Sequence, residues 1–422
     1  MRMETNDNGI LAKLVAANVK AQRPNGDNAP CLKVVYLIDS IKRPEEIDVL
    51  KNIYGRGFYL FAVNSPEEQR LKFLEMDCNI NSLDQRRDLL NRDQSEDSGH
   101  GQSTRESFHL ADFFVSEIGE VNQLTSHLFR FLDIIFGSPF ETPTFDEYAM
   151  FLAYAASTRS ADLSRQVGAV VTMKNDVIAT GANECPKAFG GSYWRVFDKS
   201  TNKYQDIALG RDYTRGHDPN ARERERIIEK LGEGLDVDSL ARVRENVKNS
   251  GINDLTEFGR IVHAEMDALL QCARQGTSCK DAELFCTTFP CHNCAKHLVA
   301  SGIRRIVFVE PYPKSKALSL HEDSITTSNN DVTKVVFESF IGVGPRQFMN
   351  FFSMSLSIGG KMRRKSQGTS NKIEWDRNSA RPRVKMFPSS YMENEEAARV
   401  SAMNSIESSG LSISGASSLV IS

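Results

Sequence analysis

His263-Ala264-Glu265 and, after a gap of 24 residues, Pro290-Cys291-His292-Asn293-Cys294 are the two most informative motifs of this chain. One imidazole and two thiolates are suitable ligands for a tetrahedral zinc ion. A site with three protein ligands leaves the fourth position open for water, as is typical of catalytic zinc sites. We therefore predict one zinc ion per chain, held by His263, Cys291 and Cys294.

Glu265 is predicted to be the catalytic residue of this site and not a ligand, because one nitrogen and two sulfurs already supply the three protein ligands. Zinc lowers the pKa of a bound water from about 15.7 to about 7. A neighbouring carboxylate can take the proton of that water and deliver it to the reacting group. General acid–base work of this kind contributes about 10²–10⁴ in rate.

Other interpretations of the cysteines and histidines remain open at this point. A structural zinc knuckle would need a fourth ligand, for which His292 and His297 are nearby, although neither has a ligand-like spacing. The cysteines could also be ordinary core residues. Cys272 and Cys279 could belong to a second metal site.

The local sequence predicts alternating helices and strands around the motifs. A short helix is expected over Ala264–Ala273, with His263 and Glu265 at its first turn. Glu283–Thr288 is β-rich and predicts a strand. Cys291 and Cys294 begin a second helix that ends near Gly302, and residues three apart share one helix face. Residues 303–309 predict a further strand.

Composition limits the class of protein. The chain has 422 residues, 40% hydrophobic and 25% charged, with a net charge of −3. These values are ordinary for a soluble protein of two or three domains, and they argue against a broad nucleic-acid surface. Eight cysteines in so long a chain are not a disulfide framework. The sequence has no apolar stretch of 18 residues and no secretory leader, so we expect a cytoplasmic protein without a membrane span.

Residues 1–140 predict a first domain in which strands and helices alternate. Strands are expected over Lys33–Asp39, Gly57–Val63 and Phe108–Val115. Pro44 opens a helix, and Ser65 is predicted to cap another in a capping box with Glu68. This alternation implies a parallel sheet covered by helices.

Residues 144–320 predict a second domain, with an insert at about 190–255. A helix is expected over Phe145–Thr158, followed by a hairpin that turns at Lys174-Asn175. Residues 321–362 are predicted to be a docking extension. The basic and then serine-rich tail, 363–422, is predicted to be flexible.

The motifs of the second domain occur together and in a specific order. They are Arg159-Ser160-Ala161-Asp162, Arg165-Gln166-Val167-Gly168-Ala169-Val170, Gly181-Ala182-Asn183, His263-Ala264-Glu265 and Phe289-Pro290-Cys291-x-x-Cys294. With these motifs the chain resembles the zinc-dependent deoxycytidylate deaminases over roughly residues 145–315. The resemblance implies an α/β/α sandwich of the cytidine deaminase type. It also implies hydrolysis of the exocyclic amine at C4 of cytosine, a reaction in which Glu265 protonates ring N3 and helps ammonia leave.

The resemblance further implies substrate contacts from two loops. Asn183 is expected to hydrogen-bond the 3′-hydroxyl of the sugar, although an asparagine beside a glycine can simply be a turn residue. Arg159 and Arg165, together with Ser160, are expected to bind phosphate, since guanidinium groups present a planar fork of donors. Either arginine could instead be a surface charge.

Two aromatic residues are further candidates for substrate binding. Phe289 and Tyr312 are expected to stack on the base or the sugar, or else to belong to the core. One motif departs from the family, whose sugar loop usually has the sequence Gly-Tyr-Asn-Gly. Here the loop is Gly181-Ala182-Asn183-Glu184, and a long insert follows Pro186.

The first domain resembles part of a P-loop nucleotide kinase, through VVYLIDSIKRPEEIDVL and GFYLFAVNSPEEQRL. It is incomplete, because the Gly-x-x-x-x-Gly-Lys-Ser/Thr phosphate loop is absent from the sequence. With FESFIGVGPRQF behind the deaminase region, the whole chain resembles the anti-phage dCTP deaminases of bacteria. That resemblance implies deamination of dCTP and dCMP, and the resemblance to the deaminase family implies a homo-oligomer. Because constant deamination of dCTP would harm the host, we also expect control by a nucleotide effector or an inhibitory partner.

Two other functions compete with this interpretation. An RNA- or DNA-editing cytidine or adenosine deaminase would need a basic groove with stacking aromatics, which the acidic net charge disfavours. A regulatory protein with a vestigial kinase half and an inactive deaminase half is the other alternative. The intact His263, Glu265, Cys291 and Cys294 argue against it.

Overall fold

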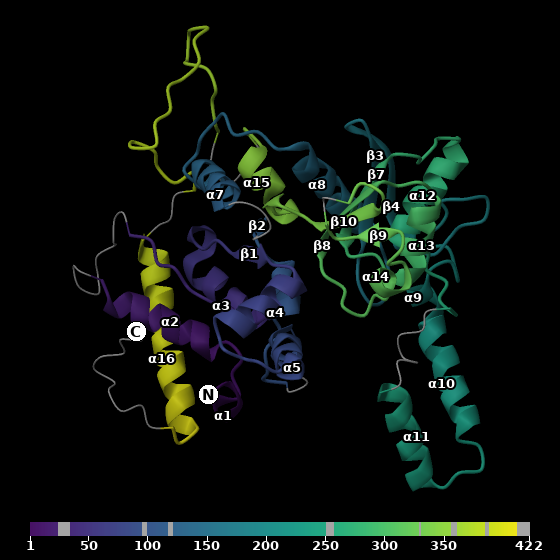
Figure 1. The fold of residues 1–422 in the computed structure, drawn as a ribbon. Helices are drawn as coiled ribbons and strands as arrows, with labels where there is room; N and C mark the ends of the chain where they lie inside the picture. Colours follow the sequence, from purple (N-terminus) through teal and green to yellow (C-terminus); the bar gives the residue numbers. More distant parts are fainter. Residues whose placement is uncertain are drawn as a thin grey trace. The chain divides into compact units, whose positions relative to one another are not determined.

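The computed structural model describes residues 1–23, 34–94, 99–116, 121–249, 257–328, 331–355, 361–384 and 388–411. The chain forms two compact units (Figure 1). Unit 1 comprises residues 1–143 and 341–422, and unit 2 comprises residues 144–340. The predicted extension, 321–362, is therefore divided between the two units. Its first part completes the sheet of unit 2, and its second part belongs to unit 1.

Unit 2 is built on a six-stranded mixed sheet with the order β4-β3-β7-β8-β10-β9. β3 pairs antiparallel with β4 on one side and with β7 on the other. From β7 onward, through β8 and β10 to β9, neighbouring strands are parallel. Their bounds are β3 Gly168–Met173, β4 Asp176–Ala182, β7 Glu283–Thr288, β8 Arg305–Glu310, β9 Ile325–Thr326 and β10 Val335–Ser339. The predicted strands of the second domain are confirmed to within two residues, and β9 and β10 extend the sheet.

Helices cover both faces of this sheet, as the sandwich prediction requires. The helices are α8 Phe145–Ser157, α12 Ala264–Gln275, α13 His292–Ala300 and α14 Ala317–Leu320. Gly168 lies so close to α8 that an added Cβ would meet the Ala153 carbonyl at 1.9 Å. Gly181 lies equally close to α12, where a Cβ would meet the Ala264 carbonyl at 2.0 Å. Because Gly181 pairs with the neighbour of Gly168, the two glycines face opposite sides of the sheet.

The local signals at the start of unit 2 have clear physical causes. The hairpin between β3 and β4 turns at Lys174 and Asn175, whose φ angles are 52° and 66°. Two consecutive positive φ angles are typical of a type I′ turn, which matches the twist of the strands. Thr144 and Glu147 form a capping box at the start of α8. The hairpin prediction is confirmed, whereas the capping box was missed.

The insert of unit 2 is helical over half of its described length. It contains the hairpin β5 Val196–Asp198 and β6 Lys203–Gln205, and the helices α9 Asp212–Arg215, α10 Pro219–Leu231 and α11 Val237–Asn249. Residues 250–256 of the predicted insert lie outside the described residues. Arg222 and Arg226 are exposed on α10, as expected for a solvated helix face.

Unit 1 contains a small three-stranded sheet with the order β1-β2-β11. β1 Phe61–Asn64 and β2 Phe113–Ser116 are parallel, and β11 Gly342–Val343 adds an antiparallel edge. The helices are α1 Arg2–Thr5, α2 Ile10–Ala21, α3 Pro44–Tyr54, α4 Glu67–Met76, α5 Leu83–Gln94, α6 Thr104–Phe108, α7 Val121–Ile135, α15 Phe348–Phe352 and α16 Pro388–Ser408, with 3₁₀ turns at Gly55–Gly57 and Pro345–Gln347. The α/β class is confirmed, but the sheet is not purely parallel.

Two local predictions for unit 1 are wrong. Lys33 itself lies outside the described residues, and residues 34–39 form neither strand nor helix. Val35 and Leu37 are 77% and 93% exposed, so the apolar run that suggested a buried strand finds no sheet neighbour. The helix α4 begins after Pro66 without a side-chain cap. Ser65, the predicted cap, stands too early to accept a bond from the first turn.

The tail of the chain also differs from the prediction in its described part. The 21-residue helix α16 packs against α2, and Figure 1 shows the two helices side by side. Ala402 and Ile406 of α16 are buried with Ile10 and Leu14 of α2. Burial of these apolar side chains stabilises the pair and explains why this segment is ordered. Residues 412–422 of the predicted flexible tail lie outside the described residues.

None of the helices that the structure describes has both the length and the hydropathy needed to cross a membrane.

Candidate active site

The three predicted zinc ligands lie at the starts of two helices. His263 is the N-cap residue of α12 and Cys291 is the N-cap residue of α13, each with extended backbone angles. Cys294 lies one turn further along α13 and is buried. The positive ends of helix dipoles stabilise anionic thiolates, so this position favours metal binding.

The spacing of the three side chains fits a zinc ion. Nδ1 of His263 lies 3.4 Å from the sulfur of Cys291 and 3.4 Å from the sulfur of Cys294. A tetrahedral ion with Zn–S of about 2.3 Å and Zn–N of about 2.0 Å would separate nitrogen and sulfur by about 3.5 Å. All three ligand atoms lie within 4.8 Å of one another.

No second group of three metal-ligating side chains occurs among the residues that the structure describes. Cys272 and Cys279 hydrogen-bond to each other, and burial together with this contact raises the pKa of Cys272 to about 12. No third ligand joins Cys272 and Cys279 among the described residues, so they do not form a second metal site. His292 and His297 do not join the His263 group either, so the structural-knuckle alternative lacks a fourth ligand among the described residues.

Glu265 is the second residue of α12 and is only 4% exposed. Burial raises the pKa of its carboxyl, and the Cys294 thiol is a hydrogen-bond partner. It lies beside the ligands without belonging to the metal-binding group. A buried carboxyl in this position can exchange a proton with a reacting molecule at the metal.

The three ligands also share protons with one another. Hydrogen bonds from Cys294 and His263 lower the pKa of Cys291 to about 4. The bond with Cys291 raises the pKa of His263 to about 9. Both shifts have the same cause, because the Cys291 sulfur accepts hydrogen bonds from Cys294 and His263. A metal cation can replace the protons of these hydrogen bonds.

Asn183 and Ser160 lie together, but they bind the protein backbone. Oδ1 of Asn183 accepts a bond of 2.7 Å from the Val167 amide, and Nδ2 donates to the Arg165 carbonyl at 2.8 Å. Ser160 donates through its hydroxyl to the Asn183 carbonyl at 2.6 Å. These bonds join the two predicted substrate loops. Nδ2 has a second hydrogen that can still be donated to a substrate hydroxyl.

The two predicted phosphate ligands have different surroundings. Arg159 forms an ion pair with Asp267 of α12 and contacts Ser192 of the insert. Nη1 of Arg165 lies 3.1 Å from Oε1 of Glu310, and the Arg165 side chain is 42% exposed. Its guanidinium lies 5.4 Å from the ring centre of Tyr312. Of the two arginines, Arg165 is the more accessible to an anionic ligand.

Phe289 and Tyr312 also differ in burial, since Phe289 is buried and Tyr312 is only partly buried. Phe289 is 8% exposed and packs edge-on against Phe308, with ring centres 4.8 Å apart. Its second neighbour is Phe337. Phe289 therefore lies in the core of unit 2, as the alternative interpretation of this residue expected. Tyr312 is partly buried against this core, beside Arg165.

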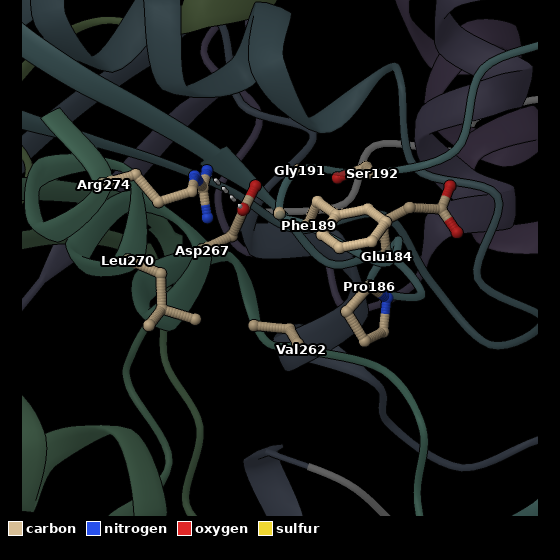
Figure 2. A pocket seen from close by; sticks show the side chains of 10 residues that line it. Glu184, Pro186, Phe189, Gly191, Ser192, Val262, Asp267, Leu270 and Arg274 are labelled. Atoms are coloured by element: carbon tan, nitrogen blue, oxygen red, sulfur yellow. Dashed lines mark ion pairs between the residues drawn. The ribbon is translucent and has the colours of Figure 1, made fainter.

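A cavity of about 340 Å³ lies on another face of α12, and Figure 2 shows the side chains that line it. Asp267, Leu270 and Arg274 line it from one side of the helix, and Asp267 and Arg274 form an ion pair of 3.8 Å. The sugar loop contributes Glu184, and no zinc ligand lines the cavity. Sequence reasoning did not predict these residues, although the spacing 267, 270, 274 places them on one helix face.

Comparison with known proteins agrees with this geometry. A family model described as the cytidine and deoxycytidylate deaminase zinc-binding region matches residues 143–310, which include the zinc ligands and Glu265. A deoxycytidylate deaminase of Enterobacteria phage T2 is 30% identical over 169 residues, covering 39% of this chain and 79% of that protein. The chain belongs to the deoxycytidylate deaminase family. As a member of it, the protein is a zinc-dependent hydrolytic deaminase of nucleotides.

Two further proteins are similar to this family member. The deoxycytidylate deaminase of Saccharomyces cerevisiae is 24% identical over 290 residues, covering 66% of this chain and 76% of that protein. A solved dCMP deaminase of the cyanophage S-TIM5, in complex with dCMP and dUMP, is 18% identical with a TM-score of 0.27, covering 47% of this chain and 99% of that chain.

Proposed function

We propose that this protein converts dCMP to dUMP and dCTP to dUTP, with release of ammonia. The observation that supports this most is the triangle of His263, Cys291 and Cys294, beside the buried carboxyl of Glu265. Membership of the deoxycytidylate deaminase family supports a deoxycytidine nucleotide as the substrate.

Glu265 carries the proton transfers in the proposed mechanism. A zinc ion held by His263, Cys291 and Cys294 would supply a water whose pKa lies near 7. Glu265 would take one proton of the attacking water and deliver it to N3 of the cytosine ring while the water oxygen bonds to C4. Glu265 would then carry the proton of the new C4 hydroxyl to the exocyclic amine, so that the C4–N bond breaks, ammonia leaves and C4 becomes the carbonyl of uracil. Burial keeps bulk water away from this carboxyl and fixes its orientation.

The proposed nucleotide contacts follow the accessible groups of the two loops. Arg165 binds phosphate, because its guanidinium is the more exposed of the two candidates and can offer a fork of donors. Tyr312 lies beside Arg165 and packs against the sugar or base. Asn183 donates its second N–H to the sugar 3′-hydroxyl. Arg159 and Ser160 shape the loop through Asp267 and Asn183. Phe289 supports the zinc segment from the core.

We further propose a role in depleting deoxycytidine nucleotides during phage infection, in the cytoplasm. The support is the order of regions in the sequence, in which a kinase-like region precedes the deaminase. Unit 1 has two parallel strands with flanking helices, but residues 34–39 do not form the strand that the kinase resemblance implies, so the proposal rests on the sequence resemblance. A nucleotide effector or an inhibitory partner would restrain an activity that also harms the host.

A homo-oligomer is proposed on a separate observation in the insert. Phe197 and Tyr204 are 47% and 68% exposed, and their ring centres lie 5.1 Å apart. Large apolar side chains that gather on a surface are typical of protein contacts. Light scattering during gel filtration tests this: we expect a mass above one chain, and substitution of Tyr204 by serine should reduce it.

The function is tested by ammonia release from purified protein with dCTP, dCMP, deoxycytidine, CTP and single-stranded DNA side by side. We expect turnover of dCTP and dCMP, and none of the polynucleotide. Turnover of the polynucleotide alone would replace the proposal with an editing function.

A further inference from the structure

Glu184, which stands where the family usually has glycine, joins four segments around the active site. Its backbone forms an antiparallel bridge with Val262, with N···O distances of 3.1 and 3.0 Å. Val262 directly precedes the zinc ligand His263. The Glu184 carboxylate accepts a hydrogen bond of 3.2 Å from the amide of Ala161, which lies in the loop between Arg159 and Arg165. The side chain is 2% exposed, so its charge is removed from water.

The insert supplies the cation that faces this carboxylate. Nε of Arg211 lies 3.2 Å from Oε2 of Glu184, an ion-pair contact whose N–H is not aligned for a hydrogen bond. Arg211 is itself held by Asp206 at 3.1 Å and by the Tyr193 carbonyl at 2.6 Å. Its side chain is 9% exposed. Because both side chains are buried, the Glu184 carboxylate depends on Arg211 for compensation, whereas Arg211 is compensated by Asp206 and Glu184 together.

The next residue of the insert, Asp212, holds the other strand of the bridge. Its Oδ1 lies 2.6 Å from a terminal nitrogen of Arg260, two residues before Val262. The Cys185 thiol lies 3.5 Å from the same oxygen. Arg260 also donates to the Gly210 carbonyl at 3.1 Å. Arg211 and Asp212, two consecutive insert residues of opposite charge, therefore form ion pairs with the two bridged segments. One segment carries the sugar loop and the other leads to the zinc ligand His263.

We propose that Arg211 and Asp212 are positioning residues, through which the insert holds the sugar loop in register with His263. Arg211 acts on the loop of Asn183 through Glu184, and Asp212 acts on the segment before His263 through Arg260. This inference rests on the proposed function, because it assigns the two residues to substrate placement in that reaction. The insert is thus part of the active-site architecture.

The first test is substitution of Arg211 by methionine, which keeps the length of the side chain and removes its charge. Displacement of a substrate loop by about 1 Å can cost up to 10²-fold in rate or binding. We expect KM for dCMP to rise about tenfold and kcat to change less than about threefold, because Glu265 and the zinc ligands stay in place. Zinc content should equal that of the unaltered protein.

A double-mutant cycle with Glu184→Gln isolates the pair. If the two charges compensate each other, the double variant should bind substrate better than the product of the single effects predicts. The matched control is Arg226→Ala, because Arg226 forms an exposed ion pair with Glu223 in the same insert. Its KM should equal that of the unaltered protein.

Hydrogen exchange gives a readout that does not depend on activity. In Arg211→Met, the amides of 181–187 should exchange faster, and in Asp212→Asn those of 258–264 should do so. Unchanged exchange and unchanged KM in folded variants would overturn the proposal. If Arg211→Met does not fold, Arg211→Lys keeps the charge and takes its place, with a smaller rise in KM expected and an unchanged KM contradicting us. Absence of turnover in the unaltered protein would contradict the proposed function alone, since hydrogen exchange would still report on positioning.

Discussion

The two units of this chain pack their sheets in different ways. In unit 2, Gly168 and Gly181 allow helices to approach the sheet until backbone nearly touches backbone. In unit 1, the core around β2 is aromatic: Phe113 packs against Phe131 and Phe351 with tilted rings, at ring-centre distances of 4.7 and 5.2 Å. Rings fill space with fewer demands on backbone position than glycine contacts do. The closest backbone contacts of Gly168 and Gly181 lie in the unit that must place catalytic groups precisely.

The difference has a functional meaning. Gly181 contacts the first residue of α12, and His263 and Glu265 flank that residue. The position of β4 in the sheet therefore determines where His263 and Glu265 lie. Unit 1 has no metal-binding group among its described residues. Substitutions in the two units should consequently separate chemistry from stability.

The largest effect is expected from Cys291→Ala. Loss of one of three protein ligands should release the zinc ion, and metal assistance contributes several kcal/mol to catalysis, or about 10³-fold in rate. We expect turnover to fall by at least that factor and zinc content, measured by mass spectrometry, to fall with it. The control is Cys78→Ala in unit 1, where the thiol is exposed. Loss of activity in Cys78→Ala as well would break the comparison.

Gly181→Val should follow. Its Cβ would meet the Ala264 carbonyl at 2.0 Å, so α12 would have to move. We expect the free energy of unfolding to fall by more than about 4 kcal/mol, which is exceptional for one substitution, and zinc to bind more weakly. Urea denaturation and zinc titration measure both. At Gly99 of unit 1, where a Cβ meets no atom within 4 Å, the same change should have little effect.

Phe113→Ala sharpens the comparison from the other side. The ring is fully buried in unit 1, and truncation of a buried phenylalanine costs about 3–5 kcal/mol. We expect urea unfolding at lower denaturant concentration, with turnover per folded molecule and zinc content unchanged. A fall in kcat of the folded protein would mean that unit 1 takes part in the chemistry.

Lys42→Ala should have the smallest effect. Lys42 and Asp93 of unit 1 form an ion pair of 2.6 Å, with side chains 29% and 38% exposed. Solvent-exposed pairs of this kind contribute less than about 1 kcal/mol. The shift in urea midpoint should be close to the error of measurement, and a large shift would show that this pair is more than a surface contact.

The sequence predicted unit 2 well, because its signals are local and chemical. The ligand spacing of His263, Cys291 and Cys294 has few other uses, and the turn at Lys174-Asn175 has a defined geometry. It predicted unit 1 less well. The apolar residues 34–38 indicate burial, but a strand also needs a neighbouring strand, which no local pattern supplies. The packing of α16 on α2 joins segments almost 400 residues apart, so no local window could predict it.

Within the site, sequence reasoning identified the groups that meet at the metal but not those that hold the loops together. Asn183 and Ser160 were predicted to contact substrate, yet each also binds backbone of the neighbouring loop. The contacts of Glu184 with Arg211 and of Arg159 with Asp267 depend on the fold of the insert and of α12. The loop Gly181-Ala182-Asn183-Glu184 departs from the expected pattern, but sequence reasoning assigned no role to Glu184.

The most direct test of the account is the turnover of dCMP and dCTP by Glu265→Gln, with zinc content measured on the same sample. Glutamine keeps the shape of the side chain but cannot exchange the proton, and general acid–base catalysis is worth about 10²–10⁴ in rate. We predict one zinc ion per chain and a loss of ammonia release by at least the lower of these factors. Full turnover in a zinc-loaded Glu265→Gln protein would contradict the assignment of Glu265, and with it the proposed mechanism.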